Sequence, residues 1–160
     1  MNPNTKKLHD VGQSIWLDNI SREMLMDGTL ARYIADWSVT GLTSNPTIFE
    51  HAISHGNFYD EAMGHFARRG ESGEELFFRL ALQDLTAAAD MFRPVFDATG
   101  GVDGWVSLEV SPLLVNDSLR TIHAASRYMR RLIAPTFSSR FRAHRRAFKR
   151  LRSRSSMESP

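Results

Sequence analysis

The sequence predicts an α/β fold in which strands and helices alternate along the chain and the strands form a mainly parallel sheet. Three short apolar segments, at residues 14–18, 39–43 and 105–110, have the composition of buried strands. The segments between them carry apolar residues at helical spacing, which predicts helices. Two parallel strands are usually connected by such a helix. An open doubly wound sheet and a closed barrel begin in the same way, so the pattern leaves the architecture open.

The first strand is predicted by the segment Ser14-Ile-Trp-Leu-Asp18, and a helix is predicted after it. Ser21 is a good N-cap because its hydroxyl can accept from a free amide of the first turn. One amphipathic helix is expected behind it, since the apolar residues recur at helical spacing. They are Met24, Leu25, Leu30, Ile34 and Trp37.

The second and third units repeat this order. Val39-Thr-Gly-Leu-Thr43 predicts a strand, and Pro46 suits the first turn of the helix after it. A long helix is predicted from Ser72 to Phe96, and Gly100-Gly101 ends it. The third strand is expected at 105–110, and Asp117 is expected to cap a further helix through Arg127.

The composition is that of a globular domain: 160 residues, 42% hydrophobic and 24% charged. Cysteine is absent, which excludes disulfides, thiolate metal sites and a cysteine nucleophile, and which fits a reducing compartment. No stretch approaches the roughly 18 apolar residues of a membrane span, and no apolar run follows the lysines of the N-terminus. A cytoplasmic protein without membrane contacts is the expectation.

Charge divides the chain into two differently composed parts. Residues 1–117 hold 8 Lys/Arg and 17 Asp/Glu, a net charge of −9, whereas residues 118–160 hold 12 Lys/Arg and one acid, a net charge of +11. The basic pI therefore comes from the C-terminal part.

Two acids, Asp18 and Glu109, lie at or near the carboxyl ends of predicted strands, where functional residues of parallel sheets gather. A pair of carboxyl groups in one site can move protons. The structural alternative is that Asp18 caps the next helix and Glu109 forms an ion pair. Position alone favours the structural alternative.

Two further motifs are weak. His51 and His55 are four residues apart on a predicted helix, but Ala52 stands where a metalloprotease motif needs glutamate, so both are predicted to be solvated surface histidines and no metal is expected. Gly100-Gly101 precedes a strand and does not link a strand to a helix, so it is no phosphate-binding loop.

Residues 140–154 contain eight basic residues and two phenylalanines. Such a segment can bind nucleic acid by releasing counterions from phosphates, which makes a small nucleic-acid-binding protein the alternative function. Duplex affinity that falls with salt and disappears on deletion of residues 128–160 would support it. A basic tail without a specific nucleic-acid partner is the preferred interpretation.

Three long motifs together resemble the first strand motifs of bacterial transaldolases, in the same order and spacing. They are Gly12-Gln-Ser-Ile-Trp-Leu-Asp-Asn19, Gly41-Leu-Thr-Ser-Asn-Pro-Thr-Ile-Phe49 and Val106-Ser-Leu-Glu-Val-Ser-Pro-Leu-Leu114. The resemblance covers roughly residues 8–127. It implies a (β/α)8 TIM barrel, of which this chain holds about three of eight strands.

The resemblance also implies an activity: transfer of a dihydroxyacetone unit between sugar phosphates through a lysine Schiff base, without metal or organic cofactor. By match to the motifs, Asp18 is the acid/base group for carbon–carbon cleavage and Glu109 assists the water of imine formation and hydrolysis. Asn45 and Thr43 hold substrate hydroxyls. Imine chemistry needs proton transfer at several stages, so these roles are physically reasonable.

The chain departs from the family where a fourth strand reading approximately I-K-V-P should supply the lysine. The lysines of this chain are Lys6, Lys7 and Lys149, and none ends an apolar strand. A Schiff-base lysine needs a desolvated or cationic setting, whereas Lys149 lies in a solvated basic run. No Schiff-base lysine is therefore assigned, and the chain alone is expected to be inactive.

We hypothesise that a frameshift after the Arg127 codon produced the tail. With one nucleotide restored there, suitable codons for Tyr128 to Arg146 read L-H-A-A-T-D-R-P-N-L-F-I-K-V-P-G-T-P-E-G in the other frame, which contains the missing lysine. We therefore predict a partial barrel domain at 1–127 and an out-of-frame, unstructured or irregular tail at 128–160. A separately translated C-terminal half could complement the barrel.

Overall fold

The computed structural model describes residues 2–44, 46–108 and 116–132, with the side chains of 128–132 excepted. The chain divides into two compact units, residues 1–113 and 114–160. In the first unit the elements are α1 (Pro3–Asp10), β1 (Ile15–Asp18), α2 (Arg22–Met26), α3 (Thr29–Trp37), β2 (Val39–Ser44), α4 (Pro46–Ser54), α5 (Asp60–Ala67), α6 (Gly73–Met91), α7 (Arg93–Ala98) and β3 (Trp105–Leu108). The second unit contains α8 (Ser118–Leu132).

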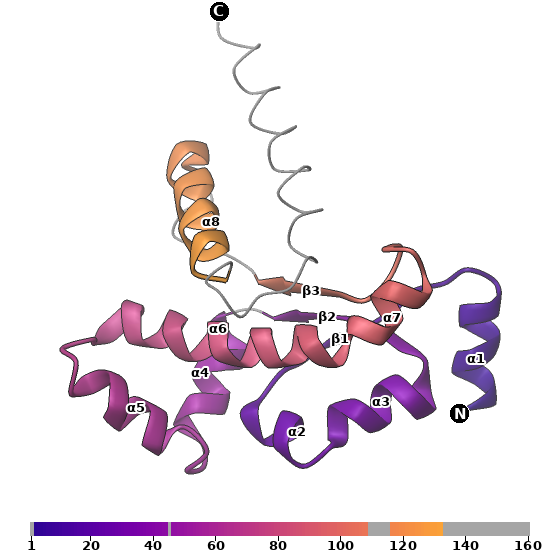
Figure 1. Cartoon of the computed structure of the whole chain (residues 1–160), viewed down its shortest axis with the longest axis horizontal. Helices are drawn as coiled ribbons and strands as arrows, with labels where there is room; N and C mark the ends of the chain where they lie inside the picture. The colour runs from indigo at the N-terminus through magenta and orange to yellow at the C-terminus, as the bar shows by residue number, and fades with distance from the viewer. Residues whose placement is uncertain (1, 45, 109–115, 133–160) are drawn as a thin grey trace, which may run out of the picture. The chain divides into compact units, whose positions relative to one another are not determined.

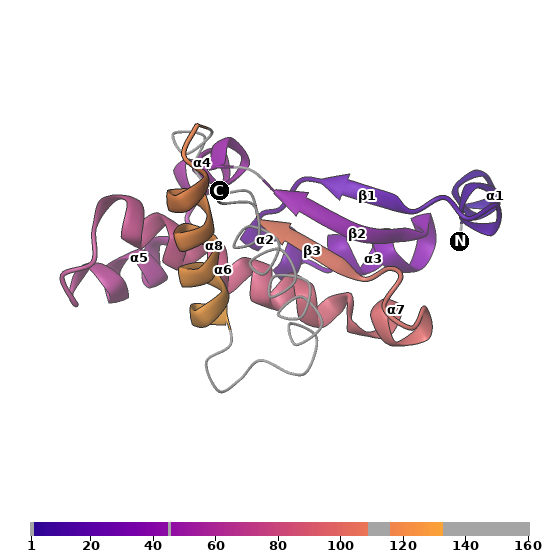
Figure 2. The ribbon, with the colours of Figure 1, turned by 90° about the horizontal axis from the view of Figure 1, so that it is seen from above.

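The predicted α/β class is confirmed: the three strands form one parallel sheet in the order β1-β2-β3. Helices α2, α3, α6 and α7 lie on one side of this sheet (Figure 1). The strands point the same way, with their carboxyl ends toward α2 and α4 and their amino ends toward α1 and α7 (Figure 2). This arrangement is the beginning of a TIM barrel, as predicted, with three strands in the part that the structure describes.

The core lies between the sheet and the helices. Leu42 of β2, Leu30 of α3 and Phe92 after α6 are fully buried in it. Ala81, Leu85 and Ala88 form the inner face of α6, and their small or branched side chains let the helix approach the strands. Leu17 packs against the same cluster, so alternate residues of each strand face the core.

A register shift near the amino ends of β1 and β2 sets which residues face away from the core. Ile15 is opposite Val39 but Trp16 is opposite Gly41, so Thr40 is the extra residue of a bulge. The Thr40 carbonyl accepts a hydrogen bond from the Gly104 amide at 2.7 Å. From Trp16 onward the alternation is regular, and Leu17 is opposite Leu42.

Some helix boundaries differ from the prediction. The single helix expected after Ser21 is two helices, because Gly28 has a φ of 79° and interrupts the turn. The single helix expected at 72–96 is also divided, into α6 and α7, with Pro94 in the first turn of α7. Helices α1 and α5 were not predicted, and the expected end of the third strand at 109–110 lies outside the described residues.

Two predicted caps are confirmed. The Ser21 hydroxyl accepts from the Met24 amide at 3.2 Å, and the Asp117 carboxylate accepts from the Arg120 amide at 2.8 Å. Helix α8 continues to Leu132, so the first residues of the predicted irregular tail are helical, and residues 133–160 lie outside the described part. None of the helices in the described ranges is long and apolar enough to cross a membrane.

Ser38, which ends α3, predicts a stabilising substitution. Its φ of 55° is left-handed, and its buried hydroxyl has no hydrogen-bond partner in the part of the chain described. Ser38→Gly removes both costs but makes the unfolded chain more flexible, so the free energy of unfolding should rise by about 1 kcal/mol in urea titrations. Ser38→Ala keeps the Cβ in the left-handed region and should gain less. A glycine variant less stable than the parent would contradict this account.

Candidate active site

Asp18 and Thr43 lie side by side at the carboxyl edge of the sheet. Asp18 is the last residue of β1, and its Cα partner in β2 is Thr43. Thr43 is in turn opposite Ser107 of β3. Neighbouring strands are about 4.8 Å apart, so one carboxylate and two hydroxyls form a short polar row across three strands. Asn45 and Glu109, the other two predicted site residues, lie outside the described residues.

This row is on the face of the sheet that points away from the helical core. Leu17 and Leu42 face the core, and the alternation of a strand turns Asp18 and Thr43 to the other side. Asp18 is exposed and Thr43 is half-buried. A carboxylate in this position can exchange protons with a bound molecule, and the adjacent hydroxyls can hydrogen-bond to it.

Trp16 and Gly41 are paired on the same face of the sheet, two residues before Asp18 and Thr43 along their strands. A Cβ on Gly41 would lie 2.5 Å from Cε2 of Trp16, so only glycine lets the indole lie across β2. Trp16 remains 42% exposed. The polar row at the strand ends therefore has an aromatic side chain next to it on the same face of the sheet.

Hydrogen bonds fix the strand ends that carry the row. The buried Ser44 hydroxyl donates to the Ser107 carbonyl at 3.1 Å, which ties β2 to β3 next to Thr43. The first turn of α2 is capped by Ser21, and the structure gives Asp18 no capping bond to that helix. The helix-cap interpretation of Asp18 therefore has no support in the described residues.

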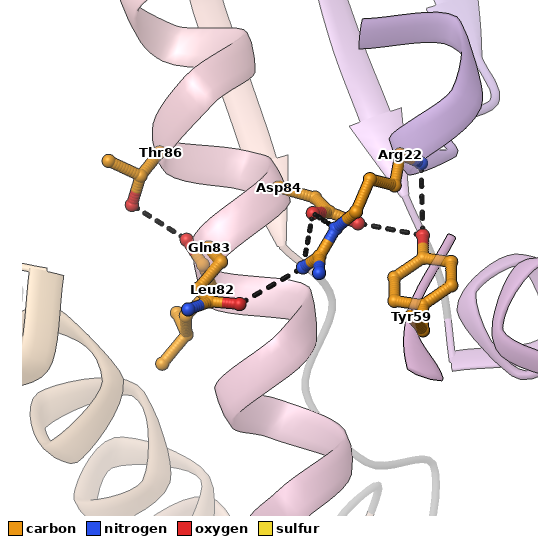
Figure 3. A network of polar contacts seen from close by, with 6 residues as sticks. All are labelled: Arg22, Tyr59, Leu82, Gln83, Asp84 and Thr86. Carbon is orange, nitrogen blue, oxygen red and sulfur yellow. Dashed lines mark hydrogen bonds and ion pairs between the residues drawn. The ribbon is translucent and has the colours of Figure 1, made fainter. Parts of the chain in front are cut away.

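A buried polar cluster that was not predicted from the sequence joins Arg22, Tyr59 and Asp84 (Figure 3). The Arg22 guanidinium donates to one oxygen of Asp84 through Nε at 2.8 Å, and the Tyr59 hydroxyl donates to the other at 2.7 Å. The Arg22 guanidinium also donates to Gln83 Oε1 at 3.0 Å. Asp84 and Tyr59 are 2% and 1% exposed. One signal was available: Asp84 stands among apolar residues on the inner face of a helix, where an acid needs partners.

Burial is the largest cause of the pKa shifts of Asp84 and Tyr59. It raises the pKa of Asp84 above its ordinary value, and the Tyr59 hydrogen bond and the Arg22 charge only partly oppose that shift. Burial also raises the pKa of Tyr59, with the neighbouring Asp84 charge adding to the effect. Tyr59 therefore remains a hydrogen-bond donor to Asp84 throughout the physiological pH range.

The raised pKa of Asp84 predicts a pH dependence of stability. Its contribution is fully present below the unfolded-state pKa of 3.8 and is lost as the pH rises through the folded-state pKa. The stability of the parent relative to Asp84→Asn, which cannot titrate, should therefore fall as the pH rises above the unfolded-state pKa of 3.8. Urea titrations of both proteins at a series of pH values measure the difference. A difference that grows with pH would show that the Arg22 charge outweighs burial.

The other sequence candidates do not assemble into a site. The exposed rings of His51 and His55 stack with centroids 4.0 Å apart, and His55 Nδ1 is 2.8 Å from the His51 carbonyl oxygen. The ranges that the structure describes contain no group of three or more His, Cys, Asp or Glu placed to hold a metal. Gly101 lies in the turn before β3, and the basic segment 140–154 lies outside the described residues.

The lysines of the described part are remote from the polar row. Lys6 and Lys7 are exposed on α1, which lies toward the amino ends of the strands (Figure 2). The Lys6 ammonium pairs with Asp10 at 2.6 Å. Lys149 lies outside the described residues.

A parallel sheet with helices on one side and polar residues at the carboxyl ends of its strands is consistent with part of a TIM barrel. The family model described as Transaldolase/Fructose-6-phosphate aldolase matches residues 15–138, and the chain belongs to this family. The matched range extends past residue 127, where we predict the barrel domain to end.

Curated relatives named transaldolase agree with this membership. The chain is 48% identical over 120 residues to the transaldolase of Thermobifida fusca, covering 75% of this chain and 33% of that protein. It is 47% identical over 122 residues to transaldolase 1 of Streptomyces avermitilis, covering 76% and 32%. Over 131 residues it is 40% identical to the transaldolase of Kocuria rhizophila, covering 82% and 36%. The chain thus spans about a third of the length of these relatives.

Proposed function

We propose that this chain carries the first part of a transaldolase site. The reaction is transfer of a dihydroxyacetone unit between sugar phosphates through a lysine Schiff base, in the non-oxidative pentose phosphate pathway of the cytoplasm. The observation that carries the proposal is the adjacency of Asp18 and Thr43 at the carboxyl edge of a sheet whose sequence matches this family.

Each proposed role follows from the chemistry of an imine reaction. Cleavage of the carbon–carbon bond needs a base for a substrate hydroxyl, and the carboxylate of Asp18 can accept and return that proton. Thr43 lies next to it and, with Asn45, would hold substrate hydroxyls and so orient the bond that breaks. Glu109 would assist the water that is lost and gained when the imine forms and hydrolyses.

The Schiff-base lysine is the part of the site that residues 1–160 do not supply. The Lys6 ammonium is paired with Asp10, and α1 lies at the edge of the sheet away from the row. A nucleophilic lysine needs a desolvated or cationic setting, which an exposed helix does not provide. By itself this chain would therefore hold proton-transfer and substrate-binding groups without forming the covalent intermediate.

The frameshift after Arg127 remains our explanation for the missing lysine. It accounts for most of the net charge of +11 in residues 118–160 without any nucleic-acid partner, because 10 of the 12 Lys/Arg of this range lie after residue 127. A second polypeptide carrying the remaining strands and the lysine would complete the site, because the outer edges of β1 and β3 have no strand partner in the described part of the chain. The nucleotide sequence across the Arg127 codon tests the frameshift itself.

Complementation tests the proposed function. The chain is co-expressed with the part of the Thermobifida fusca relative that follows its matched region, and the purified pair is assayed for transfer from fructose 6-phosphate to an aldose phosphate. We expect transfer activity from the pair and none from either chain alone. A stable pair that binds fructose 6-phosphate but transfers nothing would contradict the roles assigned to Asp18 and Thr43.

A further inference from the structure

One buried carboxylate, Asp84, joins three segments that are far apart in the sequence (Figure 3). We propose that Asp84, acting with Arg22 and Tyr59, is a positioning residue that holds the segments after β1 and β2 in place at the edge where Asp18 and Thr43 lie. That Asp18 and Thr43 bind substrate rests on the proposed function. That the Asp84 hydrogen bonds hold these segments in place does not.

The contacts form a closed ring of hydrogen bonds. The two oxygens of Asp84 accept from the Arg22 guanidinium at 2.8 Å and from the Tyr59 hydroxyl at 2.7 Å. The same hydroxyl accepts from the Arg22 backbone amide at 3.0 Å. The Arg22 guanidinium also lies over the Tyr59 ring, with Cζ 4.5 Å from the centroid. Tyr59 therefore fixes both ends of Arg22, its backbone and its side chain.

The position of each member explains why the ring bears on the site. Arg22 begins α2, and only residues 19–21 separate it from Asp18. Tyr59 lies between α4 and α5, in the long segment that leaves the sheet after Thr43 and Ser44. Asp84 is in α6, the helix that crosses beneath the sheet toward β3 (Figure 1). The ring thus links the helix that follows β1 to two parts of the connection between β2 and β3.

Directional bonds distinguish this ring from ordinary core packing. Burying a carboxylate and a guanidinium costs desolvation free energy that apolar residues of similar volume avoid. An apolar trio would fill the same space without fixing the direction of the Arg22 amide or the Tyr59 hydroxyl. What the ionic ring adds is a defined position for the first turn of α2, and hence for the end of β1.

Amide hydrogen exchange of the full chain tests this inference with two conservative variants. Tyr59→Phe keeps the ring packing and removes the hydroxyl, and Asp84→Asn keeps the shape and removes the charge. The matched control is Thr86→Ala, because the Thr86 hydroxyl donates only to the Leu82 carbonyl of its own helix at 2.6 Å. The internal reference is the Gly104 amide, which donates to the Thr40 carbonyl at the opposite edge of the sheet.

In both variants we expect the amides of Asp18 and Thr43 to exchange about ten-fold faster, and the Gly104 amide to stay within about two-fold of the parent. The control should stay within about two-fold at both edges. Equal acceleration at both edges, or none in Tyr59→Phe, would overturn the inference and leave the ring a merely structural feature. If Asp84→Asn does not fold, Tyr59→Phe alone decides.

A second measurement separates this inference from the proposed function. Fructose 6-phosphate is added to the parent and to Tyr59→Phe, and the amide signals of Thr43 and Ser107 are followed by NMR. A response in the parent that weakens at least three-fold in the variant supports both claims. No response in the parent, together with selective exchange at the carboxyl edge, would reject the substrate site while the positioning role stands.

Discussion

Asp18→Asn is expected to lower the transfer rate of the complemented pair by about 10²–10⁴-fold, the range usual for loss of a positioned acid/base group. The amide has the shape of the carboxylate but cannot take a proton from a substrate hydroxyl. Because Asp18 is exposed at a strand end, the substitution should leave folding and pairing of the chains unchanged. Initial rates with fructose 6-phosphate measure the effect, and size-exclusion chromatography checks the pairing.

The matched control for this experiment is Asp10→Asn on α1. It removes the same charge from an exposed aspartate whose partner is Lys6, at the other edge of the sheet. We expect it to retain the activity of the parent pair within about two-fold. An Asp18→Asn pair within about three-fold of the parent would show that the acid/base group is elsewhere.

Asp84→Ala is expected to lower the free energy of unfolding by about 3–5 kcal/mol, because the buried Tyr59 hydroxyl loses its acceptor and the partly buried Arg22 guanidinium loses its counter-charge. The Asp84 side chain is 3% exposed and that of Arg22 is 15% exposed, so water cannot replace the lost bonds easily. Urea titration monitored by circular dichroism measures the change. A loss of this size is a large part of the stability of most small domains.

An exposed ion pair supplies the control for Asp84→Ala. Arg93 and Asp97 of α7 pair at 2.5 Å with half of the Asp97 side chain exposed, so Asp97→Ala should cost less than about 1 kcal/mol. If the two substitutions cost the same, the Asp84 cluster would not be a buried ionic network that stabilises the fold.

Features that depend on local sequence were predicted well. The strands followed from short apolar segments, and the caps at Ser21 and Asp117 followed from side chains that can accept from a free amide. The breaks at Gly28 and before Pro94 were missed because the apolar spacing continues across each of them, although both residues are helix breakers. Helix α1 has no buried residue, so its sequence lacks the apolar face from which helices such as α6 were predicted.

Features that depend on register could not be predicted from the chain alone. The bulge at Thr40 decides that Asp18 is opposite Thr43, and Ser107 joins them only because β3 pairs in the register observed. The distances between these three residues in the sequence do not show that they are opposite one another in the sheet. Asp84 was readable as an acid on an apolar helix face, but its partners Arg22 and Tyr59 come from distant segments.

Borohydride trapping with fructose 6-phosphate tests the central claim most directly, namely that this chain has the proton-transfer and substrate groups of a transaldolase but not its nucleophile. Reduction fixes any imine as a stable adduct, which intact-mass and peptide mass spectrometry detect, and the Thermobifida fusca relative serves as the positive control. We predict no sugar adduct on the purified chain under conditions that label the relative. A stoichiometric adduct on Lys6, Lys7 or Lys149 would contradict the claim.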